Sequence, residues 1–131
     1  MVATIKKFED LQIWQLAREM SNEVFILMTK TDLKIDYRLK DQINGSSGSV
    51  MDNIAEGFER DGNKEFHNFL SIAKASSGET RSQLYRIVDR QYITEQKFEG
   101  LKEKSLVLSG KIGAFMSYLR KNEFRGNKYK T

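Results

Sequence analysis

Near the end of the chain, residues of one apolar seam recur in alternating steps of three and four. An α-helix turns once every ~3.6 residues, so residues with this spacing line one face of a helix in a heptad pattern. Thr94 precedes the seam and is a suitable N-cap residue. The spacing predicts a helix from about Glu95 to Lys121. The seam consists of Phe98, Leu101, Ser105, Leu108, Ile112, Phe115 and Leu119.

Three earlier segments carry the same periodicity. They predict helices from about Asp10 to Lys30, from about Asp36 to Phe58 and from about Asn63 to Arg90. The connections between them are short, so each helix must turn back along the one before it. The absence of proline is compatible with long helices. We expect an all-α fold, an antiparallel up-and-down four-helix bundle, in a single domain of residues 1–121 followed by a basic C-terminal tail of residues 122–131.

The segment from Asn44 to Ser49 has the composition of a turn, because glycine costs about 1 kcal/mol inside a helix. However, apolar residues keep the helical phase on both sides of it, from Ile43 to Val50 and Ile54. We interpret the segment as helix whose small residues let a neighbouring helix approach closely. Residues 76–78 form a similar small patch in the next helix, and we expect the two patches to face each other.

The composition excludes several kinds of site. Without cysteine, the chain has no disulfide, thiolate zinc site, iron–sulfur cluster or cysteine nucleophile. His67 is the one histidine, whereas a di-iron site in a helix bundle takes two Glu-x-x-His motifs. The glycine-rich segments match neither a phosphate-binding loop nor a serine nucleophile elbow. We expect no metal, no cofactor and no catalytic residue, with His67 at the surface or its boundary.

The hydropathy pattern offers no membrane segment. No stretch approaches the ~18 unbroken apolar residues of a membrane span, and the N-terminus lacks the apolar core of a signal peptide. We therefore expect a cytoplasmic protein without a membrane partner.

The net charge of +4 is confined to residues 118–131, because the rest of the chain is neutral. Two aromatic residues, Phe124 and Tyr129, are interleaved with the basic ones. Cations for phosphates and flat rings for unstacked bases are what a nucleic-acid contact needs, although a short charged tail can also serve solubility alone. The candidate residues in this segment are Arg120, Lys121, Arg125, Lys128 and Lys130.

Four polar residues take positions that lean toward the interior: Asn53, Glu56, Glu79 and Gln83. One interpretation is a catalytic carboxylate pair, Glu56 and Glu79. The other is a structural polar network that fixes helix register or an interface between subunits. Isolated burial of a carboxylate costs several kcal/mol, so a buried one needs partners. We favour the structural network, because no histidine, cysteine or metal set accompanies the carboxylates.

Three blocks of the sequence resemble one known family. Residues Phe8 to Ala17 resemble the motif F-x-x-L-x-x-W-x-x-A, residues Ser49 to Arg60 resemble S-[IV]-x-x-N-I-A-E-G-x-x-R, and residues Lys64 to Ala73 resemble K-E-F-x-x-F-L-x-I-A. These motifs are typical of the four-helix-bundle family named after the 23S ribosomal RNA intervening sequence. The resemblance covers roughly residues 8–119, and Glu79 and Gln83 match polar positions downstream.

The resemblance implies a left-handed bundle in a bacterial protein that is usually a homo-oligomer, with pentameric rings known. Family members are encoded within insertions in 23S ribosomal RNA genes or are free-standing. A related branch serves as accessory protein to the reverse transcriptase of diversity-generating retroelements and binds nucleic acid through a basic surface. No catalytic residues are attached to the family. Family members often have a basic pair at the positions that Asn44 and Gly45 occupy in this chain. We therefore expect nucleic-acid contacts to depend more on Arg81, Arg86, Arg90 and the basic C-terminal end.

Three functions remain open from the sequence. The first, which we favour, is a non-enzymatic homo-oligomer, a pentamer by resemblance, that binds RNA or DNA, with RNA favoured. The second is an oligomeric protein-interaction scaffold or an accessory subunit of a reverse transcriptase. The third is an enzyme that uses Glu56 and Glu79. The second is supported by apolar residues outside the main stripes, namely Ile13, Phe25, Ile26, Leu106 and Met116.

Overall fold

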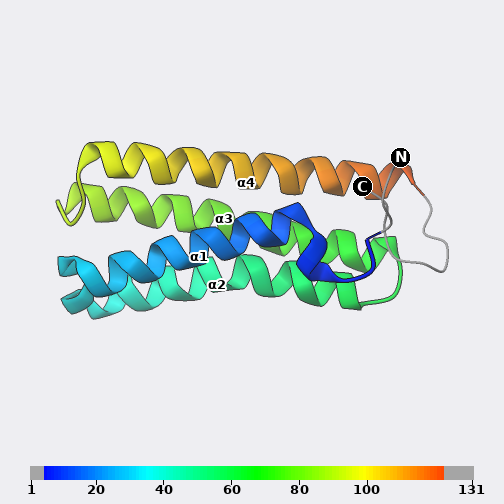
Figure 1. Ribbon diagram of the computed structural model, residues 1–131, viewed down its shortest axis with the longest axis horizontal. Coiled ribbons are helices and arrows are strands. Elements are labelled where there is room, and N and C mark those ends of the chain that lie inside the picture. The colour runs from blue at the N-terminus through cyan, green and yellow to red at the C-terminus, as the bar shows by residue number, and fades with distance from the viewer. Residues whose placement is uncertain (1–4, 123–131) are drawn as a thin grey trace.

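The computed structural model describes residues 5–122, and its helices lie close to the ranges that the periodicity predicts. Successive helices run in opposite directions (Figure 1), so the predicted up-and-down four-helix bundle is confirmed. Within residues 5–122 there is no β-strand. The elements are the 3-10 helix η1 (Phe8–Asp10), α1 (Gln12–Lys30), the 3-10 helix η2 (Asp32–Ile35), α2 (Tyr37–Glu59), α3 (Asn63–Asp89) and α4 (Glu95–Lys121).

Local signals set the helix ends. The Thr94 hydroxyl accepts a hydrogen bond of 3.1 Å from the amide of Lys97, which confirms the predicted N-cap of α4. The first helix was expected from about Asp10, but α1 begins at Gln12, because the extended backbone of Leu11 separates it from η1. Gly62, with a φ of +88°, reverses the chain between α2 and α3.

One core runs along the bundle. All seven residues of the predicted α4 seam are buried except Phe115, which is half-buried and packs against the core. Ile13, which the pattern placed outside the main stripe of α1, is buried with the stripe. Within residues 5–122, no helix combines the length and the apolar run that crossing a membrane requires.

The small patches of α2 and α3 face each other, as expected. The hydroxyl oxygens of Ser49 and Ser76 lie 3.0 Å apart, and those of Ser46 and Thr80 lie 2.8 Å apart. The segment from Asn44 to Ser49 is helical throughout. The glycines of the two patches are not where α2 and α3 approach closely, because a Cβ built on Gly45, Gly48 or Gly78 would meet nothing within 4 Å. Serine hydroxyls therefore join the two helices at these patches.

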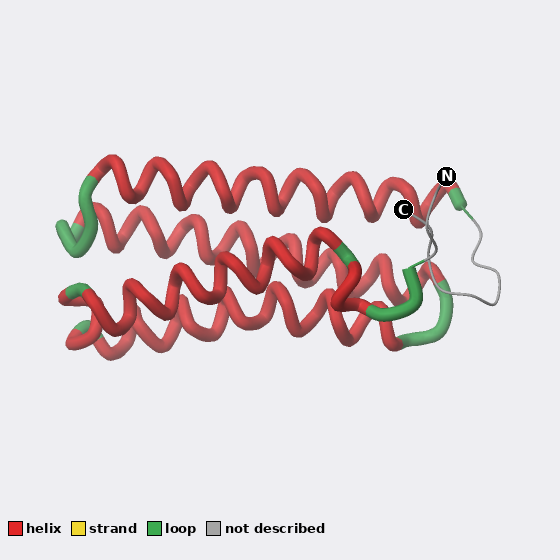
Figure 2. The backbone as a smooth tube through the Cα atoms, viewed as in Figure 1, coloured by secondary structure: helices red, strands yellow, loops and turns green. Residues whose placement is uncertain are grey.

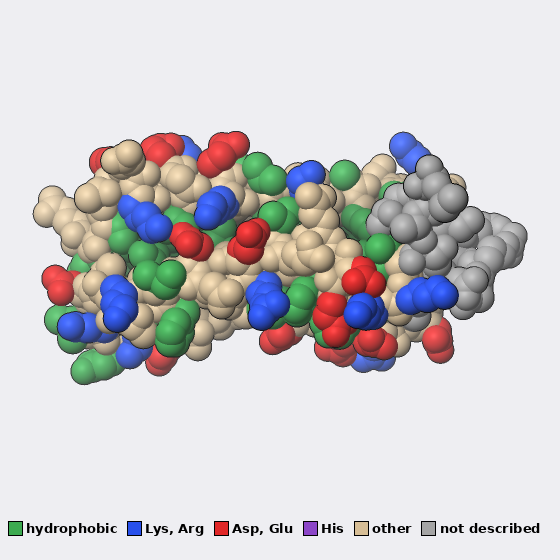
Figure 3. Space-filling model, in the orientation of Figure 1, with side chains coloured by type: hydrophobic (Ala, Val, Ile, Leu, Met, Phe, Trp, Pro, Cys, Tyr) green, Lys and Arg blue, Asp and Glu red, His purple; other side chains and the backbone are tan. Residues whose placement is uncertain are grey.

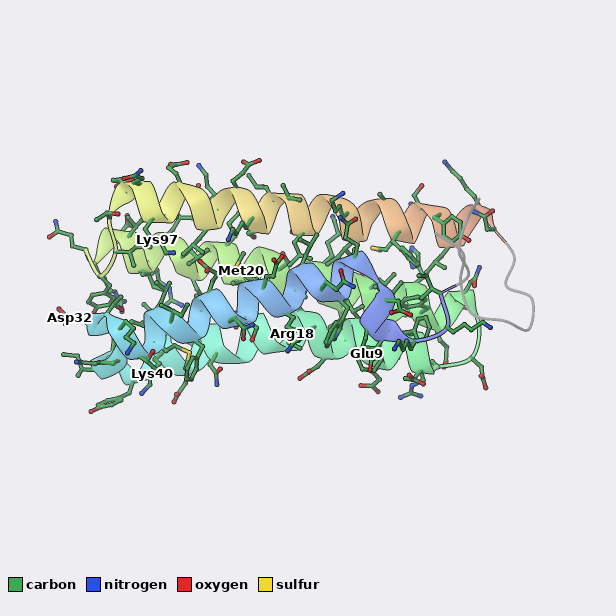
Figure 4. All side chains as sticks on the ribbon, in the orientation of Figure 1. Glu9, Arg18, Met20, Asp32, Lys40 and Lys97 are labelled. Carbon is green, nitrogen blue, oxygen red and sulfur yellow. The ribbon has the colours of Figure 1, made fainter. Side chains whose placement is uncertain are left out.

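The bundle has two distinct ends (Figure 2). We call the end that carries the α1–α2 and α3–α4 connections the distal end. We call the other the terminal end, because the α2–α3 connection and both ends of the described chain lie there (Figure 2). Asp32 and Lys40 lie toward the distal end, whereas Glu9 lies toward the terminal end (Figure 4).

Candidate nucleic-acid interface

The structure separates the basic residues that the sequence analysis considered together. Arg86 and Arg90 lie at the end of α3, near the distal end, whereas Arg120 and Lys121 lie in the last turn of α4, at the terminal end. Because α3 has 27 residues at ~1.5 Å each, about 40 Å separates the two ends. The two groups therefore cannot form one short binding site within a chain. Arg125, Lys128 and Lys130 lie outside the described residues.

The two distal arginines are both engaged by polar side chains of other segments. Arg90 Nη1 lies 2.6 Å from Asp36 Oδ2, and Arg86 Nη2 donates to Gln42 Oε1 at 2.8 Å. The Tyr92 hydroxyl also donates to Asp36 Oδ2, at 2.8 Å. The hydrogen bond from Tyr92, followed by that from Arg90, lowers the pKa of Asp36 against the opposing effect of burial. These bonds tie the end of α3 and its connection to the start of α2, which leaves Arg86 and Arg90 less available to phosphates.

Arg81 is only partly exposed. Its side chain is half-buried on α3, and its Nη1 is buried without a hydrogen-bond partner among residues 5–122. A guanidinium nitrogen in that position cannot reach a phosphate in solution without a change of side-chain conformation.

Arg120 and Lys121, by contrast, are exposed at the terminal end. Neither forms an ion pair with a carboxylate of residues 5–122. Arg120 Nη1 lies 2.8 Å from Nε2 of His67. A guanidinium only donates, so Nε2 accepts this bond and the imidazole proton is assigned to Nδ1. The contact joins the last turn of α4 to the second turn of α3.

A hollow of about 360 Å³ lies at this junction. We call it the terminal hollow, and none of its lining residues is a carboxylate. Lys64 and His67 are not among the nucleic-acid contacts that the sequence predicts. Their spacing of three residues at the start of a helix is nevertheless a signal that they share one face. The lining residues are Asn63, Lys64, His67, Asn68, Leu119 and Arg120.

Asn63 fastens the two walls of the terminal hollow. Its Nδ2 donates to the backbone carbonyl of Leu119 at 3.1 Å and also to that of Asn122. The last carbonyls of a helix have no partner within the helix, so this amide closes the end of α4. The start of α3 and the end of α4 are therefore held in a fixed relationship.

The structure assigns the four interior-leaning polar residues to two environments. Gln83 is buried, and its Oε1 accepts a 2.5 Å hydrogen bond from Ser46. Asn53 is half-buried, and its Nδ2 donates to both the carbonyl and the hydroxyl of Ser49 at 2.9 Å. Gln83 thus links α3 to α2, whereas Asn53 makes its contacts within α2.

Glu56 and Glu79 do not join them. Glu56 is exposed and pairs with Arg60 one turn later, at 2.9 Å, and Glu79 is exposed beside buried Thr80. One residue step turns the helix by about 100°, which carries Glu79 away from the buried face. The prediction that Glu56 and Glu79 belong to an interior-leaning structural network is therefore corrected: both are surface carboxylates, with no hydrogen bond between them among the described contacts.

The model of the 23S rRNA-intervening sequence protein family matches residues 9–114. A similar solved structure is a protein of unknown function from the S23 ribosomal protein family of Bacteroides thetaiotaomicron VPI-5482, with a TM-score of 0.72 and 20% sequence identity over 79% of this chain and 97% of that chain. At that identity the likeness shows the fold alone. No curated protein sequence matched.

Proposed function

Because the chain belongs to the 23S rRNA-intervening sequence protein family, we propose that it is a non-enzymatic RNA-binding protein whose contact surface is the terminal end of the bundle. The observation that carries the proposal is the exposed set of Lys64, Arg120 and Lys121, which form no ion pair with a carboxylate of residues 5–122. The basic C-terminal segment continues from the same end, after Asn122. Phosphate contacts need cations that are not already neutralised.

The remaining surface favours a local contact over an extended one. Basic and acidic side chains are interspersed along the face shown in Figure 3, with no large area of one sign. Several basic groups on other parts of the bundle are also engaged. Lys97, on α4 near the distal end (Figure 4), pairs with Glu23 of α1 at 3.1 Å, and Lys102 pairs with Glu99 at 3.1 Å. RNA bound along this face would meet carboxylates as well as cations.

A second feature supports self-association, and we propose a second copy of this chain as the protein partner. The three most exposed large apolar side chains lie around the α1–α2 connection, with exposed fractions of 61% for Phe25, 63% for Ile35 and 67% for Tyr37. Apolar side chains gathered on one surface are typical of a protein contact, and we call these three residues the distal apolar patch. Association through the distal end would leave the terminal end free for RNA, in keeping with the homo-oligomer implied by the family resemblance. A reverse transcriptase would be an alternative partner for the same patch.

The test is a fluorescence-anisotropy titration of the full chain with single-stranded RNA, an RNA duplex and a DNA duplex at several salt concentrations. We expect RNA to bind and the affinity to fall steeply with salt, because phosphate contacts release counterions. Arg120→Gln with Lys121→Gln should weaken binding by 10-fold or more. Lys30→Gln with Lys34→Gln, which removes the same charge at the distal end, is the matched control and should change affinity little.

Two results would overturn the proposal. One is the absence of RNA binding by folded protein at low salt. The other is binding that does not depend on salt, or that the distal control pair weakens as much as the terminal pair.

A further inference from the structure

We infer that the terminal hollow holds one unstacked nucleotide of single-stranded RNA. Lys64 and Arg120 contact its phosphate, and the imidazole of His67 provides the surface on which its base stacks. The inference rests on the proposed RNA-binding function and specifies which form of RNA is bound and where.

The charge of the terminal hollow suits a phosphate. Lys64 and Arg120 come from different helices, and no carboxylate lines the hollow. The acidic residue of the first turn of α3, Glu65, does not line it. The hydrogen bond with Glu56 and the charge of Glu56 raise the pKa of Arg60, and the charge of Glu65 adds to this effect. The positive charge of the hollow therefore comes from the side chains of Lys64 and Arg120, because the start of α3 and the end of α4 bring helix dipoles of opposite sign to the same place.

The shape of the terminal hollow suits a base. Leu119 lies at the base of the hollow and packs into the core behind it. His67 is half-buried, and the hydrogen bond from Arg120 holds its ring in place. Histidine is among the aromatic side chains on which unstacked RNA bases rest. Because Asn63 already fastens α3 to α4, little ordering of these walls is needed when a nucleotide enters.

A duplex cannot use the site in the same way. The bases of an A-form duplex are paired and stacked, and side chains do not reach them through its deep, narrow major groove. A single strand can turn one base out of its stack at a small cost. The hollow therefore predicts a preference for single strands, whereas exposed cations alone would bind a duplex equally well or better.

The experiment compares single-stranded RNA with a duplex of the same length in anisotropy titrations, using the full chain and three variants that are first checked for folding by thermal melting. We expect the single strand to bind at least several-fold more tightly than the duplex. Lys64→Gln with Arg120→Gln should weaken single-strand binding by 10-fold or more and reduce the slope of log K against log salt by about 1. His67→Ala should weaken binding by about 5-fold or more, and His67→Phe should restore most of it.

The outcomes separate the two proposals. If the wild-type chain binds no RNA, the proposed function fails and this inference fails with it. If RNA binds in a salt-dependent manner but substitution of Lys64 and Arg120 changes nothing, RNA binding itself stands, but it does not use these two residues and the hollow is not the site. A duplex that binds as tightly as the single strand, or equal binding by His67→Ala and the wild type, would also overturn the inference.

Discussion

Gly57 of α2 faces Phe69 of α3 so closely that a Cβ built on Gly57 would lie 2.6 Å from the Cβ of Phe69. It would also lie 2.9 Å from Cδ1 of Phe66. Gly57 ends the Asn-Ile-Ala-Glu-Gly block that carries much of the family resemblance, and Ile54 of the same block is fully buried. The block therefore serves the packing of α2 against α3.

Gly57→Ala should destabilise the protein by about 1–3 kcal/mol, because the added methyl group meets side chains that cannot move far. Gly48→Ala is the matched control: the same helix gains the same methyl group in open space, and stability should rise by about 0.5–1 kcal/mol. Urea unfolding followed by circular dichroism measures both. Equal effects at the two positions would contradict the close contact.

Asp36→Asn should reduce stability at pH 7, because the carboxylate accepts hydrogen bonds from Arg90 and Tyr92. The pKa of Asp36 is lowered in the folded protein from an ordinary value of 3.8, so its contribution is fully present above that value and is lost as the pH falls through the lowered pKa. The difference between wild type and variant should therefore shrink below about pH 4. Thermal melting from pH 2.5 to 7 checks this, and a difference that stays constant with pH would refute it.

Gln83→Met should cost about 1 kcal/mol, because it removes one hydrogen bond from Ser46 but keeps the volume of the side chain. Gln83→Glu should cost more at pH 7, about 2 kcal/mol or more, since it places a carboxylate at a buried position. That excess cost should decline as the pH falls and the new group takes up a proton. Denaturant unfolding of both variants at pH 7 and pH 4.5 tests the prediction; a pH-independent cost would count against it.

Gln91→Gly should stabilise the protein by about 1 kcal/mol. Gln91 has a φ of +63° just after α3, and the bonds from Gln91 to Val88 and from Tyr92 to Ile87 form a Schellman motif. Glycine adopts this conformation without strain. Glu103→Gly, on an exposed position inside α4, is the control and should destabilise by about 1 kcal/mol. Loss of stability in Gln91→Gly would contradict this account of the turn.

Self-association should depend on the distal apolar patch. Sedimentation should give a mass that is a multiple of the 15.2 kDa chain. Phe25→Glu with Tyr37→Glu should lower it toward that of a monomer, since charges at a contact oppose its burial. The exposed Ile72 of α3 provides a control, and Ile72→Glu should leave the mass unchanged. A wild-type monomer at all concentrations would exclude self-association.

The helices were predictable because periodicity reports directly on a helical face. The phase of Ile43, Val50 and Ile54 even outweighed the turn-like composition between them, and that segment is helical. Periodicity is less informative at the edge of a face. Glu56 lies only three residues after half-buried Asn53, yet it is exposed and paired with Arg60, and the sequence alone could not separate these two environments.

The terminal hollow was beyond prediction for another reason. Lys64 and Arg120 are 56 residues apart in the sequence, and their shared surface arises from the alignment of α3 with α4. A charge count along the chain finds Arg120 and Lys121 but not Lys64, which stands among acidic neighbours in the sequence. Likewise, the ion pair between Arg90 and Asp36 could not be predicted from the sequence, because it depends on the end of α3 lying beside the start of α2.

With four helices, the chain returns to the end from which it started, so Ile5 and Asn122 both lie at the terminal end (Figure 1). A fluorophore attached at Asn122 would therefore sit beside the candidate RNA site, because Asn122 contacts Asn63 of the terminal hollow. Probes are better attached at the α3–α4 connection, on the opposite end. The connection at Gln91 could also be opened without cutting a helix, which makes it a suitable place for an inserted probe.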